Sequence, residues 1–184
     1  PFRLMNMKTI LSLLYIFTIA HGAEAVFPST KRGEIEVKTL PSRLALQATS
    51  GEAYFDSENK TFGKLFRYIS SRKISMTTPV TVNVDQGIMR FFVAESEQNK
   101  ANESTRDVVV LPVPEQTVVS IGYGGSYTEK NYEKALTALE AWLKEHEQEW
   151  ISTGAPMAVY WHGPMVLGFF KKAEVMVAIE PVKG

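Results

Sequence analysis

The sequence predicts an α+β domain made of two similar halves that share one antiparallel sheet or distorted barrel. β-like segments and one amphipathic helix follow each other in the same order twice, and in both copies a glycine turn precedes the helix and a proline marks the next strand. The copies cover about residues 34–95 and 107–181. We therefore expect duplicated βαββ units related by a pseudo-twofold axis, with two helices on the outside or at one rim.

The first half begins with two predicted strands, 34–40 and 43–50, joined at Pro41-Ser42. A turn at Gly51 leads into a helix that ends near residue 71. Its apolar stripe has the i, i+3, i+4, i+7 spacing of one helix face and consists of Phe62, Leu65, Phe66 and Ile69. Such a stripe is most often ordinary core packing, but Lys64, Arg67 and Arg72 can reach its edge. Strands at 76–84 and 88–94 follow, and 95–106 is polar enough to be an exposed connection.

The second half repeats this order with predicted strands at 108–113 and 117–122. Ser126 and Glu129 match a capping box at the start of the second helix, whose apolar face runs from Tyr132 to Leu143. A strand at 157–161 precedes an apolar, turn-rich run at 164–170, and 174–179 is the last strand. Loops usually lie on the surface, so this apolar run either plugs the core or borders a ligand site.

Composition limits the possible functions. The chain has 184 residues, which suits one domain, and its 20 Lys+Arg balance 20 Asp+Glu. Without a basic excess, nucleic-acid binding has no electrostatic support. The chain has no cysteine, so it has neither disulfides nor a thiolate for catalysis or metal binding.

Residues 1–25 read as upstream residues followed by a signal peptide. Lys8 precedes an apolar run at 10–20, and Ala23-Glu24-Ala25 supplies an A-x-A cleavage site. The run is shorter than the ~20 residues that span a bilayer. We expect cleavage after Ala25, no membrane span afterwards, and one exported domain over 26–184, periplasmic or secreted.

Two segments far apart in the sequence resemble one known family. The helix end Phe66-Arg67-Tyr68-Ile69 is followed by Ile74-Ser75-Met76-Thr77-Thr78-Pro79-Val80, which is similar to the I-x-M-T-x-P-V signature of the SOUL haem-binding proteins. The second segment, Pro164-Met165-Val166-Leu167-Gly168-Phe169-Phe170-Lys171-Lys172-Ala173-Glu174-Val175, resembles that family's P-x-x-L-x-F-x-R-R-N-E-V. The resemblance extends from Gly33 to Val182. It implies a distorted eight-stranded barrel with two helices.

The resemblance also implies a function and a set of site residues. Haem or a metal-free porphyrin would bind reversibly. We therefore expect a monomeric or weakly associating carrier or buffer that is not an enzyme. Phe62, Leu65, Phe66 and Ile69 would form the apolar wall, Arg67 the basic contact, and Met165, Leu167 and Phe169 the lip. Two departures weaken the match. No histidine stands near Lys38-Thr39-Leu40, where some members are thought to ligate iron, and Lys-Lys-Ala replaces Arg-Arg-Asn in the second motif.

Two further residues carry chemical hypotheses. His162 enters the apolar loop and is the better candidate iron ligand, since His146 suits the end of the second helix. Glu174, if partly buried, could act as a general base in a small-molecule effector-binding or hydrolytic domain. No G-x-S-x-G elbow supports a serine hydrolase. A third hypothesis is a structural module whose apolar loop meets a partner protein.

Overall fold

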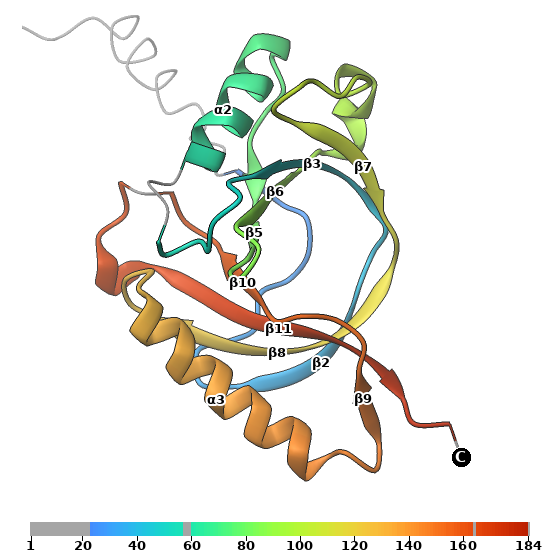
Figure 1. Ribbon diagram of the computed structural model, residues 1–184, viewed down its shortest axis with the longest axis vertical. Helices are drawn as coiled ribbons and strands as arrows, with labels where there is room; N and C mark the ends of the chain where they lie inside the picture. Colours follow the sequence, from blue (N-terminus) through green and yellow to red (C-terminus); the bar gives the residue numbers. More distant parts are fainter. Residues whose placement is uncertain (1–22, 57–59, 164, 184) are drawn as a thin grey trace, which may run out of the picture.

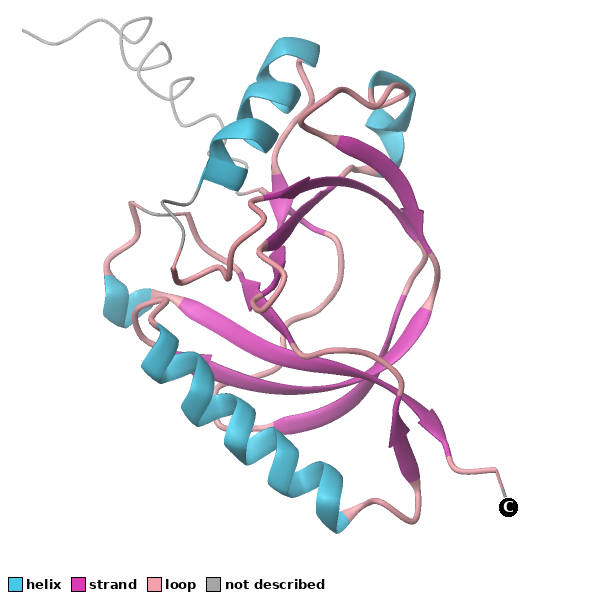
Figure 2. Ribbon diagram, viewed as in Figure 1, coloured by secondary structure: helices cyan, strands magenta, loops and turns pink. Residues whose placement is uncertain are grey.

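The computed structural model describes residues 23–56, 60–163 and 165–183, and it confirms the α+β fold (Figures 1 and 2). The predicted signal peptide lies almost wholly outside the described residues. None of the described helices is long and apolar enough to cross a membrane. The strands are β1 (Glu24–Ala25), β2 (Ile35–Leu40), β3 (Arg43–Thr49), β4 (Thr77–Thr78), β5 (Val80–Asn83), β6 (Ile88–Phe92), β7 (Val109–Val113), β8 (Gln116–Gly124), β9 (Trp150–Ser152), β10 (Met157–Tyr160) and β11 (Lys172–Pro181). The helices are α2 (Lys60–Arg72) and α3 (Glu129–Glu145), with 3-10 turns at Glu95–Lys100 and Gly168–Phe170.

Eight strands form one curled antiparallel sheet, a half-barrel, in the order β2-β8-β11-β10-β5-β6-β3-β7. This order is symmetric about the β10–β5 pair, since β2 corresponds to β7, β8 to β3 and β11 to β6. The first strand of each half pairs with the other half: β2 lies beside β8, and β7 lies beside β3. The duplicated architecture is thus confirmed, with the halves joined at the centre by β10 and β5.

Both helices pack on the outside of the curl (Figure 1). Successive side chains of a strand point to opposite faces, so the sheet contributes to two cores. The larger core lies between the sheet and the helices and includes Leu65, Leu139 and Phe91. The smaller core fills part of the hollow of the half-barrel and includes Phe92 and Met176.

The segment before β2 crosses this hollow (Figure 1). Phe27 is 5% exposed and makes edge-to-face contacts with Phe92 and Trp161. Thr30 is fully buried, and its backbone N–H donates to Glu174 at 3.0 Å. These residues follow the predicted cleavage point, so cleavage after Ala25 would remove β1 but leave this core contact in place.

Local details differ from the sequence prediction where tertiary contacts compete with local patterns. Pro79 divides the strand predicted at 76–84 into β4, which pairs with β1, and β5, which belongs to the main sheet. The residue that caps α3 is Thr128, whose hydroxyl accepts from the Asn131 N–H at 3.3 Å, so the predicted Ser126 capping box is wrong. Ser126 instead packs close to Gly168.

Candidate ligand site

A pocket of about 430 Å³ lies between α2, the β5–β6 and β10 region and the segment after β10. This volume falls within the range of about 300–1,000 Å³ that is typical of small-molecule sites. Most of its lining is aromatic or aliphatic. It is lined by Tyr54, Phe62, Gly63, Met76, Thr78, Val80, Met89, Tyr127, Tyr160, Trp161, His162, Gly163 and Lys171.

Three tyrosine rings form the inner wall of this pocket. Tyr127 stacks on Tyr160 with 4.2 Å between ring centroids, and Tyr54 lies 5.8 Å from Tyr160 on a tilted approach. The Tyr160 hydroxyl is buried and has no hydrogen-bond partner among the described residues. Burial raises the pKa of Tyr160 far above its usual range, so the hydroxyl keeps its proton. Among the described residues, the Tyr160 hydroxyl is thus an unpaired donor buried behind the pocket lining.

The four residues predicted to form the apolar wall on α2 do not all face the pocket, because two of them lie in the core. Phe62 lines the pocket and packs edge-to-face on Phe91 at 5.3 Å. Phe66 stacks on Phe62 at 6.0 Å and is 50% exposed, so it extends the apolar surface out of the pocket. Leu65 and Ile69 are 0% and 4% exposed and belong to the core beneath the helix. Their direct contact with a ligand stays a prediction that would require local opening.

The structure does not bring Arg67 to this pocket. Arg67 is exposed and borders a separate shallow hollow with Lys64, Arg72 and Asp107. The cation that lines the pocket is Lys171, whose Nζ lies 4.7 Å from the centroid of the Tyr127 ring. Lys172 points elsewhere and donates to the Ser29 hydroxyl at 2.8 Å. One basic group therefore stands at the pocket, on the loop side.

The apolar loop lies on the surface and does not plug the core. Met165 is 93% exposed, Leu167 63%, and Phe169 66%. The loop is tied to the body of the protein at the Phe169 carbonyl, which accepts from Arg32 Nη2 at 3.4 Å. Exposure of this many neighbouring large apolar side chains is typical of an interaction surface.

His162 lines the pocket, but its hydrogen bonds are poorly suited to iron ligation. Its Nδ1 accepts from the Lys172 backbone N–H at 3.0 Å, so the neutral ring carries its proton on Nε2. A ligating histidine usually donates from one ring nitrogen and binds metal with the other. Burial, then the charges of Lys172 and Lys171, lower the pKa of His162 and keep it neutral. Iron binding would require this ring to give up its contact with Lys172.

Glu174 lies behind Trp161, inside the hollow of the half-barrel, and is 0% exposed. Its carboxylate accepts from the Thr30 N–H at 3.0 Å, the Ser120 hydroxyl at 2.7 Å and Trp161 Nε1 at 2.7 Å. It also pairs with Lys38 Nζ at 2.9 Å. Four donors, one of them the charged Lys38 ammonium, thus hydrogen-bond a carboxylate that water does not reach. This arrangement favours a structural role over that of a general base. Within the described ranges, His, Asp and Glu side chains form no group that could hold a metal ion.

The family model described as SOUL heme-binding protein matches residues 24–178 of this sequence. The chain belongs to the SOUL haem-binding protein family. No curated protein matches this SOUL-family chain. Among solved structures, it resembles the crystal structure of the EcmrR C-terminal domain, with TM-score 0.63, 15% identity, and coverage of 81% of this chain and 98% of that one.

Two other solved structures show the same fold. The chain matches EcmrR in its DNA complex with TM-score 0.62 and 15% identity over 81% of its length, but spans 58% of that longer chain. It matches a protein described as a hydrolase from Listeria innocua with TM-score 0.54 and 10% identity, over 82% of this chain and 94% of the other. At these identities the likeness concerns the fold alone.

The sequence reasoning missed several pocket residues of this SOUL-family chain. Tyr54 and Tyr127 each follow the glycine turn that precedes a helix, so they hold matching places in the two halves. The internal repeat could have indicated them. Trp161 lies just before the apolar loop, and Lys171 belongs to the basic pair of the second family motif. The sequence pattern did not show which of these side chains point into the pocket. Met76, which belongs to the first family motif, also lines the pocket.

Proposed function

We propose that the protein binds haem or another tetrapyrrole non-covalently in this pocket, as a carrier or buffer. The observation that carries the proposal is the continuous apolar surface from the tyrosine-lined pocket over Phe62 and Phe66. A tetrapyrrole presents a wide flat apolar face and two carboxylates. Aromatic side chains suit the face through offset stacking, and Lys171 suits a carboxylate at the water-facing edge.

Iron ligation plays a secondary part in this proposal. His162 uses Nδ1 to hold the Lys172 N–H, and the pocket's sulfur ligands are the thioethers of Met76 and Met89. Apolar contact would therefore provide most of the affinity. Haem and iron-free protoporphyrin should then bind with similar dissociation constants. The exported location predicted from residues 1–25 belongs to the same proposal, and amino-terminal sequencing of the secreted protein tests it.

The test is an absorbance titration of the protein with haem and, separately, with protoporphyrin. The informative variant is Phe66→Ala, because Phe66 is half exposed and its loss should leave the fold intact while removing part of the ligand surface. The matched control is Ile151→Ala, which removes an exposed apolar side chain on β9, away from the pocket. We expect weaker binding of both ligands in Phe66→Ala and no change in the control.

Three results separate the outcomes. Absence of saturable binding of either ligand below tens of micromolar would refute the proposal. Loss of haem binding in His162→Ala with unchanged protoporphyrin binding would assign His162 as an iron ligand after all. Equal weakening in Phe66→Ala and Ile151→Ala would place the ligand elsewhere on the surface.

A further inference from the structure

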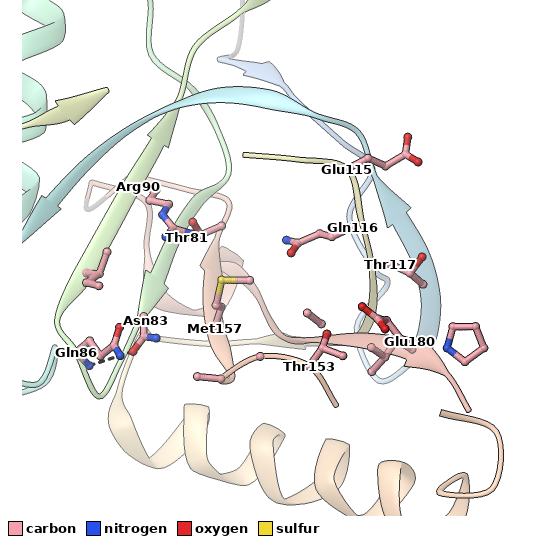
Figure 3. Close-up of a pocket in the computed structure, with 16 residues that line it drawn as sticks. Thr81, Asn83, Gln86, Arg90, Glu115, Gln116, Thr117, Thr153, Met157 and Glu180 are labelled. Carbon is pink, nitrogen blue, oxygen red and sulfur yellow. Dashed lines mark hydrogen bonds between the residues drawn. The ribbon is translucent and has the colours of Figure 1, made fainter. Parts of the chain in front are cut away.

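A second and larger cavity, of about 610 Å³, opens on the concave side of the sheet (Figure 3). Its lining differs in character from that of the aromatic pocket, because hydroxyl, amide and charged side chains make up nine of its sixteen residues. Thr81 and Asn83 come from β5, and Gln116 and Thr117 from the start of β8. Arg90 and Thr81 lie on one side, and Gln116 reaches in from the opposite strand (Figure 3). This cavity is not used by the proposed tetrapyrrole site.

The inner end of the polar cavity adjoins a small void of about 10 Å³. Thr81, Arg90, Gln116 and Met157 line both spaces, so the void continues the cavity inward. The void also borders the side chain of Arg43. A space of this size holds about one water molecule or one oxygen atom of a ligand.

Among the described residues, Arg43 is a buried cation whose guanidinium nitrogens have no hydrogen-bond partner. Its side chain is enclosed between the rings of Phe27 and Phe92, with the guanidinium carbon 4.8 and 4.9 Å from their centroids, and the residue is 9% exposed. None of its three guanidinium nitrogens has a hydrogen-bond partner among the described residues. Glu95 borders a neighbouring hollow with Arg43 but forms no ion pair with it in the described structure.

Such a group is costly to bury unless something pairs with it. A buried charged donor that stays unsatisfied costs more than a neutral one, and native proteins leave few of them. Burial lowers the pKa of Arg43 to about 10, so it still carries its charge at neutral pH. Arg90 is a second cation at the same inner end, held by a 2.8 Å bond from its Nε to Gln47 Oε1. Two guanidinium groups thus border the same small void.

We propose that the hollow of the half-barrel binds a small polar molecule through its carboxylate or phosphate group. The oxyanion pairs with the guanidinium of Arg90 and reaches Arg43 directly or through one water in the small void. The hydroxyl- or amide-bearing remainder lies in the larger cavity against Thr81, Asn83 and Gln116. Arginine suits this task because its planar fork binds oxyanions with two parallel hydrogen bonds. The exposed carboxylates of Glu115 and Glu180 line the same cavity and disfavour a ligand that is anionic throughout.

The test uses the full chain and measures thermal stability and calorimetric binding with two probes, inorganic phosphate and the hydroxyl-bearing monocarboxylate lactate, at constant ionic strength. Constant ionic strength removes general screening as a cause of any shift. We expect a saturable rise in Tm with at least one probe. Saturation with phosphate alone identifies a phosphate-bearing ligand, and saturation with lactate alone identifies a carboxylate.

Three variants localise the effect. Arg43→Met and Arg90→Gln should each weaken binding of the effective probe by about tenfold or more, the effect of losing a hydrogen bond to a charged group. Arg106→Gln removes an exposed positive charge elsewhere and should bind as the parent does. Arg43→Met also protects the test against misfolding, because replacing an unpaired buried cation by an apolar side chain is tolerated. Failure of both probes to saturate, or equal affinity in Arg43→Met, Arg106→Gln and the parent chain, overturns the proposal. Neither result bears on haem titration at the aromatic pocket.

Discussion

The buried ion pair between Glu174 and Lys38 offers the sharpest test of the fold. Glu174→Gln keeps the side-chain shape but removes the negative charge, and it places an amide N–H₂ among groups that donate. The Lys38 side chain, 10% exposed, would then face a neutral partner at a distance that is now 2.9 Å. The nearly buried Lys38 ammonium therefore loses one of its two carboxylate partners.

The magnitude follows from the remaining contacts of Lys38. Breaking one side of a buried pair typically costs about 3–5 kcal/mol. Lys38 keeps the Glu36 carboxylate at 3.3 Å, the Thr30 hydroxyl at 2.8 Å and the Pro28 carbonyl at 3.0 Å. These contacts place the expected loss near the lower limit, at about 3 kcal/mol. A domain with about 5–15 kcal/mol of stability would remain folded but would unfold at lower denaturant concentration.

Urea unfolding measures this loss as a shift of the midpoint at an unchanged m value. The double variant Lys38→Met with Glu174→Gln should recover part of the loss, since it removes the unpaired charge as well. The unfolding free energies of the parent, both single variants and the double variant together give the coupling energy between Lys38 and Glu174. A loss below about 1 kcal/mol for Glu174→Gln would refute this account of the cluster. Ester turnover by the parent chain that disappears in Glu174→Gln would instead support the general-base hypothesis.

Three other substitutions test separate elements. Leu65→Ala should cost about 2–5 kcal/mol in urea unfolding, because Leu65 is fully buried, and a much smaller loss would contradict its place in the core. Lys73 directly follows α2 with a φ of 52°, so Lys73→Gly should stabilise the protein by roughly 0.5–1 kcal/mol, and destabilisation would argue against this left-handed conformation. The pKa of His162 is lowered in the folded state, so the unfolded chain takes up that proton first as pH falls. Its contribution to stability is therefore complete above about pH 6.5 and is lost below it. The parent's unfolding free energy should fall more steeply between pH 7 and 5 than that of His162→Gln, and equal slopes would contradict the assignment.

The repeat made the architecture predictable, because each half carries its own periodicity, turn and helix stripe. Two features of the sheet were not predictable in this way. Strand β2 pairs with β8 and β7 pairs with β3, so each joins the other half of the sheet. This long-range pairing cannot be predicted from the local alternation of apolar and polar residues. β9 is a three-residue strand that pairs with β11 at one end, and it is too short to show a period.

The site was harder to predict than the fold for a related reason. A helical stripe shows which residues face inward, but not how deep each of them lies. Leu65 and Phe66 are adjacent in the same predicted stripe, yet one is fully buried and the other half exposed. Glu174 raises a similar difficulty, since its four donors come from Thr30, Lys38, Ser120 and Trp161, on different segments. Whether a carboxylate such as Glu174 is buried and has its hydrogen bonds satisfied becomes clear only in the assembled structure.

The two cavities lie on opposite faces of the same strands. On β6, Met89 lines the aromatic pocket while its neighbour Arg90 lines the polar cavity, and on β5, Val80 and Thr81 divide in the same way. At these positions the two-residue period of a strand thus gives each cavity its own lining, apolar in the pocket toward the helices and more polar in the cavity toward the hollow. Because neighbouring residues serve different faces, a substitution can alter one cavity and leave the lining of the other unchanged. The duplicated sheet can therefore carry a ligand surface beside α2 and a separate cavity in the hollow, because each is lined by different residues of the same strands.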